Sequence, residues 1–475
     1  MSGKNIWRPA GALSLLLGVG GFAHADVSLP KLISDGVVLQ RNQPVRIWGK
    51  ASPGEQVSVS VQGRRAAAVA GSDGEWVAVL EPLKAGGPYD LTVSGRNTIV
   101  VHDVLVGEVW VCSGQSNMEW PISISFQPEA TVAASPDPQL RMFTVQKSPE
   151  KYERAEVAGG QWEQASTATT ARFSAVGYHF ARTLRKALGV PVGMIHTSWG
   201  GTRIEAWTSR EMLERQGMSR QERNSFEGRN PNAASVLYNG MLAPLAKATI
   251  TGAIWYQGES NAGNPRKYRS QLVDLVADWR RTFDNPGMVF IATQLAPFRA
   301  DGNDKTSYAE IREAESMAAE GDPRVGVGVI TDVGEETDIH PRKKGPVGER
   351  MAYEALRITY GRRDVPRSPK FAGATYSAGA ATVRFARVGK GLEIRGGVSS
   401  EVAVPGDKLL GFQLAGSDGV FHAAEASIVG KDRVVVRSAK VSDPKAVRFG
   451  FVNFPVVNLY GIGGLPAEPF RSDRN

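Results

Sequence analysis

Strand-like and helix-like segments alternate along the chain between about residue 106 and residue 360. The expected strands are 109–112, 192–195, 250–256, 288–295 and 325–330, and the expected helices are 175–188, 268–283, 307–320 and 346–360. In the first of these helices, Ser174 is in position to cap the first turn and Gly189 to end the last one. Alternation of this kind predicts an α/β fold, in which helices flank a parallel sheet.

The segments on both sides of this region are rich in short strand-like runs. Val57 to Val61 alternates apolar and polar residues with period two, and glycines punctuate its surroundings. Val434 to Val436 is a short apolar run of the same kind near the other end. Because 475 residues are too many for one compact core, we predict separate units. They are a β-sandwich-like region at 26–105, an α/β domain at 106–365 and a β-rich region at 366–475.

Residues 1–25 are expected to be a signal peptide. Lys4 and Arg8 give a positive start, an apolar stretch follows, and Ala23-His24-Ala25 forms a small-x-small cleavage site before Asp26. The apolar stretch is too short to span a bilayer comfortably. We therefore expect export to the periplasm or the exterior, with no membrane span in the mature chain.

The charge distribution argues against a nucleic-acid partner, and the cysteine content excludes an internal disulfide. The formal net charge is +8, but the main compact basic cluster is only Arg342-Lys343-Lys344. We interpret this cluster as a solvated loop and predict no nucleic-acid partner. Cys112 is the one cysteine of the chain, so no disulfide can form within a monomer. The sequence carries no indication of oligomeric state.

Four polar segments follow expected strands, where ligands collect in an open α/β sheet. They are Gly114-Gln115-Ser116-Asn117, Trp199-Gly200-Gly201-Thr202, Gln257-Gly258-Glu259-Ser260-Asn261 and Asp338-Ile339-His340-Pro341. Ser116 lies on a tight turn directly after an apolar run and is the candidate nucleophile. Met118 occupies the place of the second glycine in a Gly-x-Ser-x-Gly elbow, so the turn is of another type.

A nucleophilic serine needs a base, and the chain has six histidines. His340 is favoured because Asp338 is two residues away, and Pro341 biases His340 towards an extended conformation. In an extended segment Asp338 points the same way as His340, so its carboxylate could orient the imidazole. His196, at the end of an expected strand, is the rival base. Asp332 is the alternative carboxylate.

Acyl transfer also needs hydrogen-bond donors for the oxyanion. The backbone N–H of Ser116 is available on its turn. Gly200 and Gly201 allow a backbone N–H to approach a ligand closely. The side-chain amide of Asn261 can supply a third donor. The sequence therefore contains the parts of a serine hydrolase site on separate strand ends.

Together these residues resemble the SGNH hydrolase superfamily, and specifically the sialate O-acetylesterase-like carbohydrate esterases. The markers are Gly114-Gln115-Ser116-Asn117-Met118, Trp255-Tyr256-Gln257-Gly258-Glu259-Ser260-Asn261 and Asp338-Ile339-His340-Pro341. The resemblance covers about 106–360, which makes 106–365 an SGNH hydrolase domain. It implies hydrolysis of O-acetyl groups on carbohydrates, such as sialic acid, xylan or xyloglucan, without metal or cofactor.

The resemblance also implies roles for individual residues. Ser116 matches the nucleophile, His340 the general base, and Gly201 and Asn261 the oxyanion-hole positions, with Gly200 as the alternative to Gly201. Many members of the wider superfamily have Asp three residues before the histidine, where this chain has Thr337. Asp338 is therefore the expected third member, or a Ser-His dyad operates with a backbone or Asp332 partner. The candidates for contact with the sugar are Gln115, Trp199, Arg203, Trp207, Glu259 and Phe298.

Two other functions fit parts of the sequence. A two-carboxylate glycosidase could use Glu259 with Asp338 or Glu119. A non-catalytic carbohydrate-binding protein could be built around the β-rich regions. We expect the acetylesterase, with an acetylated carbohydrate as its partner.

Overall fold

The computed structural model describes residues 1–3, 26–225, 230–300 and 305–474. Most of the expected signal peptide lies outside the described residues, so its cleavage stays a prediction. Within the described ranges no helix has the length and apolar character needed to cross a membrane.

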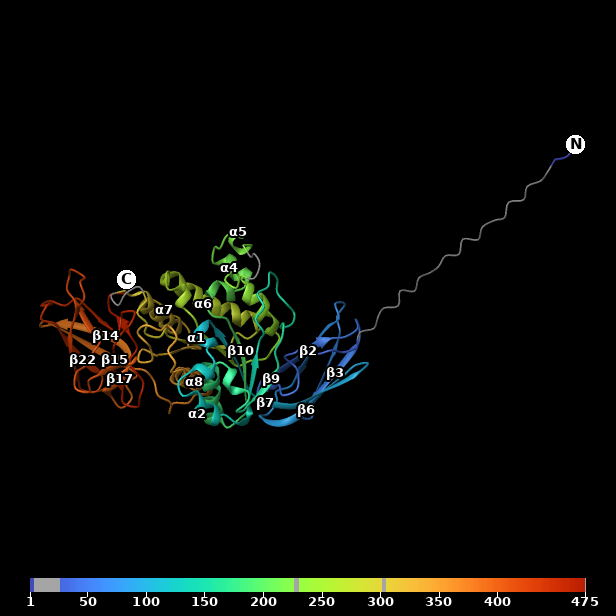
Figure 1. Cartoon of the computed structure of the whole chain (residues 1–475), viewed down its shortest axis with the longest axis horizontal. Helices are drawn as coiled ribbons and strands as arrows, with labels where there is room; N and C mark the ends of the chain where they lie inside the picture. The colour runs from blue at the N-terminus through green and yellow to red at the C-terminus, as the bar shows by residue number, and fades with distance from the viewer. Residues whose placement is uncertain (4–25, 226–229, 301–304, 475) are drawn as a thin grey trace.

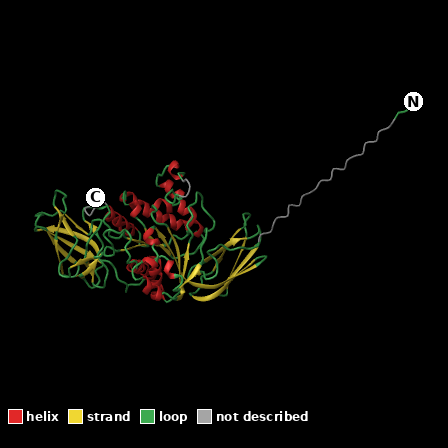
Figure 2. Ribbon diagram, viewed as in Figure 1, coloured by secondary structure: helices red, strands yellow, loops and turns green. Residues whose placement is uncertain are grey.

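A parallel sheet forms the centre of the protein, as the alternation predicted (Figure 2). Its strand order is β13 (Val325–Gly328), β12 (Val289–Thr293), β11 (Gly252–Tyr256), β7 (Thr98–Gly114), β10 (Val192–Ser198) and β8 (Asp137–Thr144). These neighbours pair in parallel, and β9 (Trp162–Ala165) adds an antiparallel edge. All five expected strands are thus confirmed, and their carboxyl ends lie along one edge of the sheet.

Helices cover both faces of this sheet (Figure 1). The long ones are α3 (Ala175–Leu188), α6 (Pro265–Thr282), α7 (Ser307–Gly321) and α8 (Gly345–Tyr360). α6 packs on α7 on one side, and α8 lies on the other side in contact with α3 (Figure 1). The predicted cap is present, because Ser174 Oγ accepts the Gly177 N–H at 3.0 Å and Gly189 adopts a left-handed conformation after the last turn. The α/β prediction for this region is confirmed.

β7 is 17 residues long and belongs to two parts of the molecule. Its first half pairs with β6 (Gly86–Ser94), and its second half pairs with β10 and β11. In the N-terminal region β2 (Val45–Lys50) pairs with β5 (Glu75–Leu80), and β3 (Gln56–Val61) pairs with β4 (Arg64–Val69) and β6. The boundary expected between residues 105 and 106 therefore falls inside one continuous strand.

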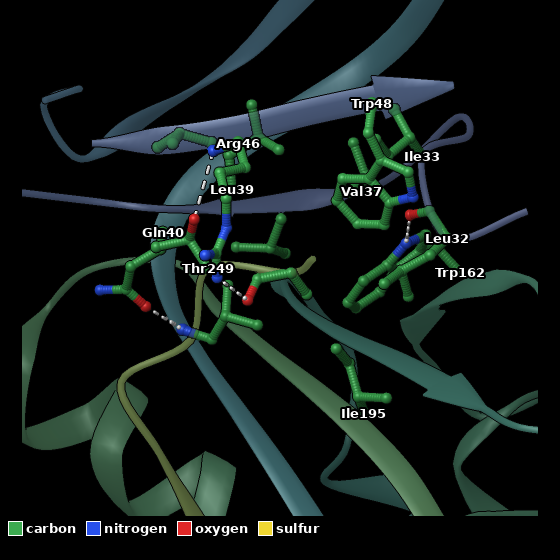
Figure 3. Close-up of a pocket in the computed structure, with 14 residues that line it drawn as sticks. Leu32, Ile33, Val37, Leu39, Gln40, Arg46, Trp48, Trp162, Ile195 and Thr249 are labelled. Atoms are coloured by element: carbon green, nitrogen blue, oxygen red, sulfur yellow. Dashed lines mark hydrogen bonds between the residues drawn. The ribbon is translucent and has the colours of Figure 1, made fainter. Parts of the chain in front are cut away.

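Apolar side chains join the N-terminal region to the central sheet around a small cavity (Figure 3). Leu39 and Trp48 approach it from the N-terminal side, and Ile195 and Trp162 from the central domain. The Trp162 Nε1–H donates to the Leu32 carbonyl at 2.9 Å across this junction. The cavity volume is about 30 Å³, which has room for a water molecule and not for a sugar. It is a feature of packing between the two parts.

The C-terminal region is β-rich, as expected, and has its own core (Figure 1). One sheet contains β14 (Lys370–Ser377), β15 (Ala380–Ala386), β22 (Arg433–Arg437) and β21 (Glu425–Val429). A second contains β20 (His422–Ala423), β19 (Phe412–Ala415), β23 (Ala446–Phe449) and β25 (Phe470–Arg471). Phe412, Phe449 and Phe470 pack together between them. The buried Arg312 of α7 donates to the Asn453 carbonyl and so ties this region to the central domain.

Candidate active site

The turn after β7 holds Ser116 at the carboxyl edge of the sheet. Gly114 has φ +137, and a Cβ there would lie 2.1 Å from the Tyr256 carbonyl oxygen, so only glycine fits between these strands. Ser116 then opens α1 (Ser116–Glu119), a single short turn of helix. Its Oγ lies 2.8 Å from His340 Nε2. The structure thus brings together the expected nucleophile and the expected base.

The imidazole of His340 is held from two directions. The Trp120 ring stacks on it, with ring centroids 4.9 Å apart and an angle of 18° between the planes. Asp338 Oδ1 accepts the backbone N–H of His340 at 2.8 Å and lies 3.7 Å from Nδ1. Burial, and then the positive charge of Lys344, lower the pKa of His340, while Asp338 acts in the opposite direction. The histidine is therefore kept neutral near pH 7, which is the form that can accept a proton.

Replacing Asp338 with Asn should have only a moderate effect on turnover. At 3.7 Å its oxygen is beyond hydrogen-bond distance from Nδ1, and 45% of its side chain is exposed. We expect kcat to fall by roughly tenfold, whereas loss of a buried, fully hydrogen-bonded triad aspartate costs about 10⁴-fold. Steady-state kinetics on an acetyl ester checks this. A loss near 10⁴-fold would mean that Asp338 forms a tight bond to Nδ1 during the reaction.

The two alternatives to this pair, Asp332 and His196, are occupied elsewhere. Asp332 receives two hydrogen bonds from Arg350, at 2.5 and 2.8 Å, and one from the Tyr460 hydroxyl at 2.9 Å. It joins the central domain to the C-terminal region. His196 is buried, its Nε2 lies 2.5 Å from Ser198 Oγ, and burial lowers its pKa to about 4. Asp332 is thus held by its own neighbours, whereas His196 bonds to Ser198 through Nε2 and its Nδ1 has no partner among the described residues. His340, and not His196, is the histidine whose ring nitrogen lies within hydrogen-bond distance of Ser116 Oγ.

The donors expected for the oxyanion lie on two loops beside Ser116. Gly200 packs on Ser116, since a Cβ on Gly200 would lie 3.2 Å from Ser116 Cβ, but its N–H donates to Glu119 Oε2 at 2.6 Å. The N–H groups of Ser116 and Gly201 have no partner among the hydrogen bonds of the described residues. Between the two glycines, Gly201 is therefore the one whose N–H is free for a ligand. Its role in the oxyanion hole stays a prediction.

The amide of Asn261 has a fixed orientation. Its Oδ1 accepts from the Ile204 N–H at 3.0 Å and from Gln257 Nε2 at 2.7 Å. Its Nδ2 donates to Glu205 Oε2 at 3.0 Å. Because an amide nitrogen carries two hydrogens, one N–H remains for a ligand. Asn261 can thus serve as a donor, in line with the expected role.

The residues expected to contact the sugar fall into two groups. Gln115 is 3% exposed, and its Oε1 accepts from Gln257 Nε2 and the Ser260 N–H. Trp207 is fully buried and packs edge-on against Trp255. The expectation was wrong for these two side chains, because they form the support beneath the site.

The second group contains side chains that a ligand can still reach. Arg203 is exposed and Trp199 is partly exposed. Lys147 Nζ lies 5.0 Å from the centroid of the Trp199 ring. Phe298 is partly buried and packs against Tyr308. Contact of these residues with the sugar stays a prediction.

The three carboxylates considered for a glycosidase all accept hydrogen bonds from neighbouring groups, and Asp338 does so from the His340 N–H, as described above. Glu259 Oε1 accepts from Asn117 Nδ2 at 2.6 Å, so Glu259 supports the serine turn, and its Oε2 has no partner among the described residues. Contact of Glu259 with the sugar stays a prediction. Glu119 accepts from Lys147 Nζ and from the Gly200 N–H. Among the described residues, no group of three or more His, Cys, Asp or Glu side chains could hold a metal ion. The arrangement is suited to acyl transfer by a serine and a histidine.

The sequence indicated no role for Asn117, although this residue lies in a marker segment, and it did not indicate Trp120 or Lys344 as parts of the site. The interpretation of Lys344 as part of a solvated loop was wrong, because Lys344 is 1% exposed. The burial of Lys344 could have been predicted from helical periodicity. Buried positions of α8 at Val347 and Met351, continued backwards by one turn, place residue 344 on the same buried face.

Comparison with known proteins identifies the family. Residues 106–357 match the family described as carbohydrate esterase, sialic acid-specific acetylesterase. The chain belongs to this family. The sialate O-acetylesterase of Homo sapiens is 30% identical over 391 residues, covering 74% of this chain and 75% of the human protein. That of Mus musculus is 30% identical over 397 residues, covering 70% and 73% respectively.

A solved structure is similar to this protein over nearly the whole chain. The crystal structure of a carbohydrate acetylesterase from Xanthomonas citri is 40% identical, with a TM-score of 0.87, and the match covers 94% of this chain and 100% of that one. The resemblance to sialate O-acetylesterase-like enzymes is thereby confirmed. The present chain is therefore a carbohydrate O-acetylesterase. The two other functions considered from the sequence, a glycosidase and a non-catalytic binding protein, are rejected.

Proposed function

We propose that the protein is a serine esterase, which removes O-acetyl groups from carbohydrates through an acetyl-enzyme on Ser116. The contact of 2.8 Å between Ser116 Oγ and His340 Nε2 carries this proposal. It lies at the carboxyl edge of the parallel sheet, where α/β enzymes bind ligands. The free N–H groups nearby support the same chemistry.

The reaction proceeds in two steps. Ser116 Oγ attacks the acetyl carbonyl carbon while its proton passes to His340 Nε2, and the N–H groups of Ser116, Gly201 and Asn261 bind the oxyanion. The bond to the sugar oxygen breaks, and that oxygen takes the proton from Nε2. A water molecule then attacks the acetyl group and gives a proton to Nε2. Acetate leaves as Ser116 Oγ recovers its proton.

The proposed substrate is acetylated sialic acid or an acetylated hemicellulose such as xylan or xyloglucan. The sialate O-acetylesterases at 30% identity support the first, and the carbohydrate acetylesterase at 40% identity supports the wider sugar class. Acetate release from acetylated sialic acid, xylan, xyloglucan and pectin tests the proposal, with the deacetylated forms as controls. Release from at least one of them is expected. Shortened glycans without free acetate would contradict it.

We also propose that the enzyme is exported and acts outside the cytoplasm. The positive start, the apolar stretch and the Ala23-His24-Ala25 site before Asp26 support this. When the full chain is expressed in a host with a secretory pathway, the exported protein should begin at Asp26. N-terminal sequencing checks this, and an intact Met1 on the exported protein would contradict it.

A further inference from the structure

Lys344 is a buried lysine close to the candidate base. It is 1% exposed and directly precedes α8. Its Nζ donates to Asn117 Oδ1 and lies 5.5 Å from the centroid of the Trp120 ring and 5.7 Å from that of Tyr256. Burial of an ammonium group is costly even with such partners. An apolar side chain would often be at least as stable in its place, so the lysine calls for a reason other than stability.

Asn117 connects Lys344 to both members of the catalytic pair. It follows Ser116 in the chain and is 1% exposed. Its Oδ1 accepts from Lys344, and its Nδ2 donates to the Ile339 carbonyl at 3.0 Å and to Glu259 Oε1 at 2.6 Å. Ile339 directly precedes His340. The amide therefore bonds to the loop of the base from a position next to the nucleophile, and Lys344 fixes its orientation.

Trp120 makes the second connection. Its ring is stacked on the His340 imidazole at 4.9 Å, and Lys344 Nζ is close to the same ring. An ammonium group within about 6 Å of an indole is attracted by its face. The ring therefore contacts both the cation and the imidazole, and its stacking restricts the plane that His340 can adopt.

Several charged groups face this cluster. The acidic groups that act on Lys344 are Glu259, Glu335 and Asp338, and the charged groups that act on His340 are Lys344 and Asp338. Burial lowers the pKa of Lys344 to about 7. Glu259 Oε2 is buried without a hydrogen-bond partner among the described residues, and burial raises the pKa of this carboxyl. Lys344 is consequently protonated in the acidic range, where His340 titrates.

We propose that Lys344 is a positioning residue for His340, acting through the Asn117 amide on the loop that carries the histidine and through the Trp120 ring on the imidazole face. The inference rests on the proposed function, in which His340 is the base. Lys344 itself touches neither the nucleophile nor the reacting atoms. Its charge also opposes protonation of His340, so its loss has a consequence that a purely structural residue would not produce.

Lys344→Met tests the proposal, because methionine keeps an unbranched side chain, only one atom shorter, and removes the charge. We expect kcat to fall by about tenfold to a hundredfold, as for other losses of catalytic geometry, with KM changed little. The acidic limb of the pH–rate profile should move to higher pH, because the charge that lowers the pKa of His340 is gone. Lys343→Met is the matched control. Lys343 is partly exposed and pairs with Glu401 at 2.7 Å, so neither kcat nor the limb should change.

Asn117→Ala is the second variant, and it keeps the test open if Lys344→Met does not fold. It breaks the bond to the Ile339 carbonyl and leaves the charge, so kcat should fall while the acidic limb stays in place. A folded Lys344→Met or Asn117→Ala protein with unchanged kcat would overturn the proposal. A limb that does not move in an active Lys344→Met protein would do the same. Ser116→Ala is measured beside them, since an active Ser116→Ala protein would refute the proposed function itself.

Discussion

Ser116→Ala should lower kcat for acetate release by at least about 10⁴-fold. The variant removes the atom that forms the acetyl-enzyme, and loss of the serine in a well-studied serine protease costs about 10⁶-fold. KM should change little, because the oxyanion donors and the sugar contacts remain. The melting temperature should also be close to that of the parent, since the hydrogen bond to His340 is the only one that Oγ makes among the described residues. Acetate assays and thermal unfolding measure the two effects.

Ser270→Ala is a suitable control for this variant. Ser270 lies on the exposed face of α6, and within the described part of the chain its Oγ bonds only to the Lys267 carbonyl of the same helix. Its substitution should leave kcat and the melting temperature unchanged. A Ser116→Ala protein that retains more than about a tenth of the activity would show that another residue attacks the ester.

His340→Ala is expected to have an effect of similar size, again about 10⁴-fold on kcat/KM. The imidazole accepts the proton of Ser116 and returns it to the sugar oxygen, so both transfers are lost together. His102→Ala is the control, because His102 is exposed in the N-terminal region and pairs with Asp90. It should retain full activity. Comparable activity in both variants would refute the role of His340.

The pH dependence of the parent enzyme follows from the same residue. Burial and the Lys344 charge lower the pKa of His340 below 6.5, and only the neutral imidazole can act as a base. The rate should therefore rise with pH along a limb whose midpoint lies below pH 6.5. A kcat/KM profile measured from about pH 4 to pH 8 checks this. A midpoint above 6.5 would mean that Asp338, and not burial, dominates the environment of His340.

The fold and the main members of the site could be predicted from local patterns. Apolar runs marked the strands, and helical periodicity marked α3 and α6. Pro346 in the first turn and Gly361 after the last one marked α8, and α7 was expected between two strands. Because parallel strands end at one edge of a sheet, Ser116 and the loop of His340 were expected to meet despite their distance in sequence. The boundary between the N-terminal region and the central domain was harder to predict from the sequence. β7 continues through both parts, and no turn separates them.

What the sequence could not provide was the burial and orientation of individual side chains. Gln115 belongs to a motif segment and Trp207 follows one, but both side chains face the interior. There Trp207 packs on Trp255, and Gln115 bonds to Gln257. The separation of 3.7 Å between Asp338 and His340 Nδ1 depends on the backbone bond that Asp338 makes to the same residue. Both are consequences of three-dimensional packing, and neither residue type nor spacing reports them.

The most direct test of the central claim is the site at which a serine-reactive phosphonate labels the enzyme. The account predicts a single modification on the peptide that contains Ser116, found by peptide mass mapping, with simultaneous loss of acetate release. The same reagent should fail to modify the Ser116→Ala protein, and it should react much more slowly with His340→Ala. Inactivation with the label on a different serine, or full activity with Ser116 modified, would contradict the account.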